Sequence, residues 1–220
     1  MSPCGPRAFA LGAACTVAAC AVAACQSFVP FARARTLGRG HWEVVAAPSV
    51  SGAVSSDSIL VHPQFDVGVR VGVHDRLDIG ARAFTYGGSL TSRIALVRAP
   101  SDERGIDVSL APALTYSIPN KLALEVPLLL GVNLHGGHAF VFSMGLTNQL
   151  FFPRGGQPWR LQPILFVTAS VGFAWRIAPV VSLVPVIGVA CVVARDPDVG
   201  TFTGNGVGVQ AGVGVVIGAR

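Results

Sequence analysis

The chain has 220 residues, of which 51% are hydrophobic and only 12% are charged, and its net charge is +5 at pH 7. An average soluble domain carries about 25% charged residues, so a soluble domain of this length would lack the charge to cover its outside. Basic and aromatic residues do not cluster together, which argues against nucleic acid as a partner. The composition instead favours a protein whose surface meets lipid.

Residues 1–25 are typical of a targeting segment, because a short basic start precedes an apolar run from Ala8 to Ala24. This layout predicts a secretory signal peptide. The run ends in Val22-Ala23-Ala24-Cys25, which resembles a bacterial lipobox and makes Cys25 the lipidation candidate. A similar pattern ends at Cys20 and, in weaker form, at Cys15, and simple cleavage after one of these alanines is the alternative.

Two further features are a lone cysteine in the body of the chain and a basic stretch that follows the targeting segment. Once the targeting segment is set aside, Cys191 is the single cysteine left, so neither an intramolecular disulfide nor a cysteine metal site is expected. Residues 26–40 show no clear periodicity and carry three arginines. We interpret them as a solvated periplasmic linker that leads to the first strand, expected from His41 to Val50.

The stretch from His62 to Phe84 predicts a β-hairpin with one apolar wall and one wall of charges and glycines. Its first arm is apolar at odd positions from Phe65 to Val73, and its return arm is apolar at odd positions from Leu77 to Ala83. Such period-two alternation places successive side chains on opposite faces of a strand. The turn between the arms is expected at His74-Asp75-Arg76.

Alternating segments and turn signals recur through residues 41–220. They predict an all-β fold of about ten strands, each near the 9–11 residues that a tilted strand needs to cross a bilayer. The expected architecture is a closed antiparallel up-and-down transmembrane β-barrel with both chain ends on the periplasmic side. Short turns are expected there at His74, Ser101, Gly136 and Ala178, and longer outward connections at Ser51–Val61, Phe151–Arg160 and Ala194–Thr203.

The expected inner faces carry a nearly balanced set of charges. They are Asp66, Arg70, Asp78, Arg82, Arg93, Asp107 and Glu125. A one-residue slip of the hairpin would turn Arg70 and Arg82 toward lipid, at a cost of about 2–4 kcal/mol for each arginine near mid-bilayer. We therefore expect these residues to line a narrow lumen and to pair across it, with glycines making room.

The element from Val71 to Gly80 resembles the strand–turn–strand unit of small Gram-negative outer-membrane β-barrels, and the likeness in pattern extends over the chain from His41 onward. The resemblance implies a location in the bacterial outer membrane. It also implies two partners, which are the lipid of that membrane and the barrel assembly machinery.

The sequence offers no strong catalytic or metal-binding pattern. His135 and His138 flank two glycines, but no carboxylate or cysteine stands nearby in the sequence to complete a metal site. Ser143 or Ser170 could be combined with His138, yet catalytic triads are defined by geometry and not by co-occurrence. We therefore expect no enzymatic activity, no metal and no cofactor.

The expected function is a structural outer-membrane barrel or a passive pore for small solutes with a charge-lined lumen. Three alternatives stay open at this point. They are a surface binding or adhesion barrel that acts through its outer loops, a lipid-modifying barrel enzyme, and a soluble secreted β-sandwich.

Overall fold

The computed structural model describes residues 27, 29–54, 59–118, 121–151, 162–195 and 207–219. The strands are β1 (Trp42–Val54), β2 (Ile59–His74), β3 (Leu77–Phe84), β4 (Gly87–Val97), β5 (Gly105–Leu110), β6 (Ala113–Ser117), β7 (Lys121–Leu134), β8 (His138–Phe151), β9 (Gln162–Ala178), β10 (Val181–Arg195) and β11 (Val207–Ala219). A single turn of 3-10 helix, η1 (His135–Gly137), joins β7 to β8. The expected targeting segment with Cys25 lies outside the described residues.

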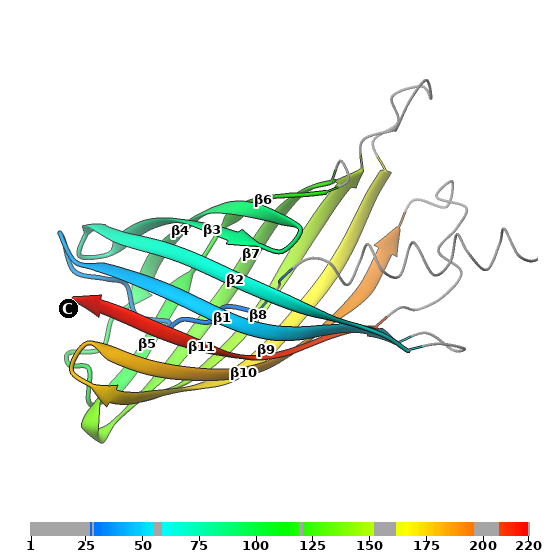
Figure 1. Cartoon of the computed structure of the whole chain (residues 1–220). Helices are drawn as coiled ribbons and strands as arrows, with labels where there is room; N and C mark the ends of the chain where they lie inside the picture. The colour runs from blue at the N-terminus through cyan, green and yellow to red at the C-terminus, as the bar shows by residue number, and fades with distance from the viewer. Residues whose placement is uncertain are drawn as a thin grey trace, which may run out of the picture.

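The strands form one closed antiparallel barrel (Figure 1). Strands that follow one another in the chain pair with one another, except β5 and β6, and β1 pairs with β11 to close the sheet. β5 and β6 are two halves of one strand position, since both pair with β4 and with β7. The barrel therefore has ten strand positions, and the predicted fold is confirmed.

The opening hairpin has the predicted register. β2 and β3 meet at a turn of Asp75 and Arg76, and Arg70 lies opposite Gly80. On the outside, Val67 and Val69 are 42% and 44% exposed. Asp66, Arg70 and Asp78 of the other parity are buried inside the barrel.

Proline interrupts the one strand that the sequence pattern treats as continuous. The alternation from Ile106 to Tyr116 predicts a single strand, but the structure divides it at Ala111 and Pro112. Proline has no backbone N–H to donate to the ladder. The Ala111 N–H instead donates to the Pro127 carbonyl at 2.9 Å, so β7 bridges the break.

The first strand is longer than predicted. We expected it to end at Val50 and a polar loop to follow over Ser51–Val61, but β1 continues to Val54 and β2 begins at Ile59. Ser51 lies inside the barrel with its hydroxyl donating to Gln64 Oε1 at 2.6 Å. Ser51 faces the polar lumen, which explains why a polar residue at this position suggested a loop. Residues 55–58 of the expected loop lie outside the described residues.

The two ends of the barrel differ. One end, which we call the turn end, contains the short connections at Asp75–Arg76, Ser101, Gly136 and Pro179, together with the start of β1 and the close of β11 (Figure 1). We call the opposite end the loop end. The predicted turns at the turn end are confirmed in position.

Apolar side chains cover the outside of the barrel. Every outward residue of β2 from Phe65 to Val73 is apolar and exposed, and Leu128 and Leu130 of β7 are 40% and 38% exposed. Among the residues that the structure describes, no helix has the length and apolar character needed to cross a membrane. A closed antiparallel sheet leaves no unpaired edge for hydrocarbon to meet. Closure, an even strand count and an apolar exterior over a polar interior make this an outer-membrane β-barrel.

Candidate functional site in the barrel lumen

The lumen is filled by the chain's own N-terminal residues. We call residues 27 and 29–40 the luminal segment. Val29, Phe31 and Leu37 of this segment are at most 5% exposed, although none of its residues belongs to a strand. It forms contacts with residues of β1, β3, β4, β5, β10 and β11, which lie on several sides of the barrel. The prediction of a solvated linker over residues 26–40 is therefore wrong for the described part of that stretch.

The luminal segment runs along the barrel toward the turn end. Near its start, Ser27 Oγ accepts a hydrogen bond from Gln210 Nε2 of β11 at 3.0 Å. Near its end, Thr36 Oγ1 donates to the Asp75 carbonyl in the β2–β3 turn at 2.9 Å. Gly40 then adopts a φ of 79°, a left-handed conformation that suits glycine, and the chain reverses into β1.

One side of the lumen carries the predicted charges. Arg70 of β2 forms ion pairs with Glu43 of β1 at 2.7 Å and with Asp78 of β3 at 3.1 Å, and all three side chains are buried. Arg82 of β3 pairs with Asp66 of β2 at 3.1 Å. Two guanidinium groups thus hold three carboxylates inside the barrel.

The other predicted luminal residues have separate partners. Asp107 of β5 accepts hydrogen bonds from Asn133 Nδ2 at 2.6 Å and from the Ala99 N–H at 2.8 Å. Glu125 of β7 accepts one from Thr115 Oγ1 at 2.6 Å. Arg93 of β4 is buried, and no carboxylate of the described residues lies within ion-pair distance of it.

The residue that the sequence reasoning missed in this network is Glu43. It lies in the second position of β1, and it is 1% exposed with its carboxylate on Arg70. Its parity in β1 is that of Ala47, Ser49 and Ser51, which are all buried in the lumen. Alternation in the first strand could therefore have identified it.

Side chains of the charged wall contact the backbone of the luminal segment. Arg82 Nη2 donates to the Ser27 carbonyl at 2.6 Å, and Ser109 Oγ of β5 donates to the Ala34 carbonyl at 2.7 Å. Arg93 donates to the Arg33 carbonyl. In the opposite sense, the Leu37 N–H donates to Asp78 Oδ2 at 3.1 Å.

Glycines of the wall stand where the luminal segment passes closest. A Cβ placed on Gly188 would lie 2.8 Å from Val29 Cγ2, one on Gly214 would lie 2.8 Å from Phe31 Cβ, one on Gly131 would lie 2.9 Å from Ala34 Cβ, and one on Gly72 would overlap the Gly38 carbonyl. Real Cβ atoms do not approach other atoms this closely. These four glycines, which lie on β2, β7, β10 and β11 around the luminal segment, leave room for it, and we call them the glycine track.

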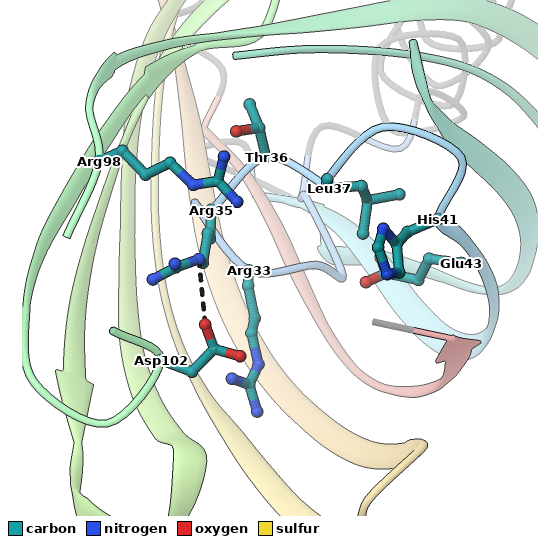
Figure 2. Close-up of a pocket in the computed structure, with 9 residues that line it drawn as sticks. Arg33, Arg35, Thr36, Leu37, His41, Glu43, Arg98 and Asp102 are labelled. Carbon is teal, nitrogen blue, oxygen red and sulfur yellow. Dashed lines mark ion pairs between the residues drawn. The ribbon is translucent and has the colours of Figure 1, made fainter. Parts of the chain in front are cut away.

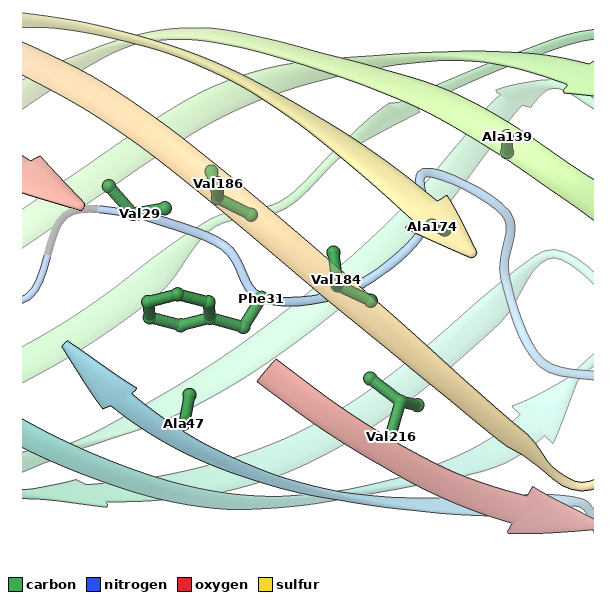
Figure 3. Packing of buried hydrophobic residues seen from close by; sticks show 8 residues of the cluster. All are labelled: Val29, Phe31, Ala47, Ala139, Ala174, Val184, Val186 and Val216. Carbon is green, nitrogen blue, oxygen red and sulfur yellow. The ribbon is translucent and has the colours of Figure 1, made fainter. Parts of the chain in front are cut away.

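The side of the lumen opposite the charges is apolar. Val29 and Phe31 of the luminal segment pack with Val184 and Val186 of β10, as Figure 3 shows. Further members of this cluster are Ala47, Ala139, Ala174 and Val216. The luminal segment thus places apolar side chains against one wall and its carbonyls against the arginines of the other.

At the turn end, arginines of the luminal segment bind the connections between strands. Arg35 Nε pairs with Asp102 at 3.1 Å and its Nη1 donates to the Ser101 carbonyl at 2.8 Å (Figure 2). Arg33 donates to the Gly137 carbonyl and, at 3.4 Å, to Ser182 Oγ. A cavity of about 150 Å³ lies beside these residues and is also lined by His41 and Arg98.

The structure does not assemble the catalytic or metal-binding sets considered from the sequence. His135 lies 3.7 Å from Glu103, whereas His138 Nδ1 accepts a hydrogen bond from the Arg176 N–H and its ring stacks on Phe173. Within the described ranges, no group of three or more histidine, cysteine, aspartate or glutamate residues could hold a metal ion. Ser143 lies opposite Ser170, with no contact to His138.

No protein-family profile matches the chain, and no curated protein matches it either. The structure is similar to that of the outer membrane protease OmpT from Escherichia coli, with 6% identity and a TM-score of 0.48 over 84% of this chain and 100% of that one. It is also similar to Neisserial surface protein A, with 12% identity and a TM-score of 0.45 over 81% and 99%. It is similar as well to OprG, an outer membrane protein from Pseudomonas aeruginosa, with 9% identity and a TM-score of 0.39 over 86% of this chain and 100% of that one. At these values the interpretation of this chain rests on its own geometry.

Proposed function

We propose that this protein is a structural outer-membrane barrel whose lumen is closed by its own N-terminal segment, with neither a catalytic role nor a standing pore for solutes. The observation that carries the proposal is the burial of the luminal segment between two chemically different walls. Its partners in this role are the lipid around the apolar exterior and the machinery that inserts such barrels.

The contacts of the luminal segment favour an ordered segment bound in the lumen over one that moves freely there. A charged group that donates to a carbonyl contributes about 1.5–3 kcal/mol, and Arg82 and Arg93 each make such a contact. The buried ring of Phe31 adds apolar burial of about 1.5–3 kcal/mol. These terms offset part of the conformational entropy that the segment loses on ordering, which is about 1–2 kcal/mol for each residue.

Two cavities beside the luminal segment are of a size that holds water molecules. The cavity at the turn end has a volume of about 150 Å³, and another beside Phe31 has about 110 Å³. A water molecule occupies roughly 30 Å³ of liquid volume. Each cavity thus has room for a few waters.

Electrical recording in planar lipid bilayers tests the proposal. The purified full-length protein is expected to insert without producing conductance steps, because the lumen is occupied. Insertion is verified independently by heat-modifiable mobility of protein recovered from the same vesicles. Stable, repeated steps from the folded wild-type protein would refute a closed lumen and favour the passive pore.

A further inference from the structure

The wall of the lumen contacts the luminal segment in two different ways along its length. From Ser27 to Ala34, polar side chains of β3, β4 and β5 bind backbone carbonyls. From Arg33 to Thr36, the segment's own side chains bind the turn end. The first kind of contact does not depend on which side chains the bound chain carries.

The donors of the wall bind the luminal segment at several points along its length. Arg82 reaches the carbonyls of Ser27 at 2.6 Å and Val29 at 3.5 Å, Arg93 reaches that of Arg33, and Ser109 reaches that of Ala34. Since every residue has a carbonyl, any peptide offers acceptors at these positions. Arginine is suited to this task because its guanidinium presents several fixed donors and stays charged.

The glycine track leaves room for the bound chain at four points of the wall. A Cβ at Gly188, Gly214, Gly131 or Gly72 would meet residues 29, 31, 34 or 38 of the bound chain at 2.9 Å or less. At these four points the wall accepts the bound chain closely, and Val29 and Phe31 pack against the apolar side chains of β10 and β11.

We propose that the lumen wall is a binding site for polypeptide main chain, and that the luminal segment is the occupant that the protein supplies itself. The proposal rests on the closed barrel proposed above, and it goes further by naming the ligand class. The ligand is a peptide of about a dozen residues, with apolar or small side chains at the positions of Val29, Phe31, Ala34 and Gly38. It is recognised by carbonyls that accept from Arg82, Arg93 and Ser109.

The experiment uses a variant that weakens a contact made by a side chain of the luminal segment and leaves the donors of the wall unchanged. Arg35→Ala removes the ion pair to Asp102 and the hydrogen bond to Ser101 without touching Arg82, Arg93 or Ser109. A fluorescent synthetic peptide with the sequence of residues 27–40 is added to this full-length variant in detergent, and its anisotropy is measured. A second peptide has the same sequence, except that Val29, Phe31 and Leu37 are each replaced by a different apolar residue.

Both peptides are expected to bind the Arg35→Ala barrel, within about threefold of one another. Adding Ser109→Ala and Arg93→Met to the same barrel is expected to weaken both at least about tenfold, since each change removes a donor to a carbonyl. The matched control is Ser143→Ala, a buried luminal serine of β8 that is not one of the donors to the segment's carbonyls, and it is expected to leave binding unchanged. Heat-modifiable mobility verifies that each barrel is folded.

Two results would overturn the inference. One is binding that the Ser109→Ala and Arg93→Met changes leave intact, and the other is binding of the native sequence alone. Neither result depends on whether the wild-type protein conducts, so a failure of the closed-lumen proposal would be seen separately in the bilayer recordings.

Discussion

Arg70 illustrates how much of the interior depends on single side chains. Its guanidinium lies between the carboxylates of Glu43 and Asp78, at 2.7 and 3.1 Å, in a region with almost no solvent contact. Burying charges is expensive, and their mutual attraction offsets that cost only while every partner is present. The three residues therefore act as one unit.

Arg70→Met is expected to lower the free energy of unfolding by about 3–5 kcal/mol, because it leaves two buried carboxylates without their cation. Urea titration of the barrel in lipid vesicles, followed by tryptophan fluorescence, measures the loss. Arg104→Met, at an exposed turn-end position, is the control and should change stability by less than about 0.5 kcal/mol. A loss below about 1 kcal/mol for Arg70→Met would contradict a tightly coupled unit.

Gly131→Ala tests the glycine track at a single position. The new methyl group would lie 2.9 Å from Ala34 Cβ, so the luminal segment or β7 must shift, and overpacking of this kind costs about 1–3 kcal/mol. Gly68→Ala is the matched control, because its nearest neighbours would lie 3.5 Å away, at ordinary contact distance. The same urea titration compares the two variants, and equal stabilities would argue against the track.

At the scale of strands, hydrophobic alternation was a sufficient guide to the fold. The two faces of the hairpin of β2 and β3 were predictable, because a slip by one position would reverse every side chain between lipid and lumen. The expected turn included His74, which the structure places in β2 beyond a register shift after Gly72. The division into β5 and β6 was missed because Pro112 interrupts the ladder without disturbing the alternation around it.

The lipid-facing surface of the strands should tolerate arginine according to depth. Leu128→Arg, in the middle of β7, is expected to destabilise the folded barrel by about 2–4 kcal/mol, whereas Val73→Arg, beside the turn end of β2, should cost about 0–1 kcal/mol. Both side chains are similarly exposed, at 40% and 42%, so depth is the variable that differs. Unfolding titrations in vesicles measure both, and equal costs would contradict the assigned lipid face.

The luminal segment could not be predicted in the same way. Its surroundings are made by residues far away in the chain, such as Ser109, which lies 75 positions from Ala34, and Gly137, which lies 104 from Arg33. It pairs with no strand, so it carries no period of two. The charged side chains of the wall could be placed on one face from the sequence, but the carbonyls that several of them bind could not.

For the molecule as a whole, we expect that the luminal segment can be released from the lumen while the barrel stays folded. The double variant Arg82→Met and Arg93→Met deletes the charged donors to the segment's carbonyls while leaving all strand pairings in place. We expect conductance steps in planar bilayers, which the wild-type protein lacks. Heat-modifiable mobility controls for folding, and a silent but folded double variant would show that these donors are not what keeps the interior shut.

The hydrogen bond between Gln210 and Ser27 joins residues 183 positions apart, and it involves the strand that closes the barrel against β1. The residues that fill the interior are thus the first of the described chain to be synthesised, and the strand that completes their enclosure is the last. Ser27 cannot acquire its amide partner until the final hairpin has arrived. Long-range contacts of this kind slow folding. We therefore expect the pairing of β1 with β11 and the ordering of the luminal segment to occur together, late in the folding of the protein.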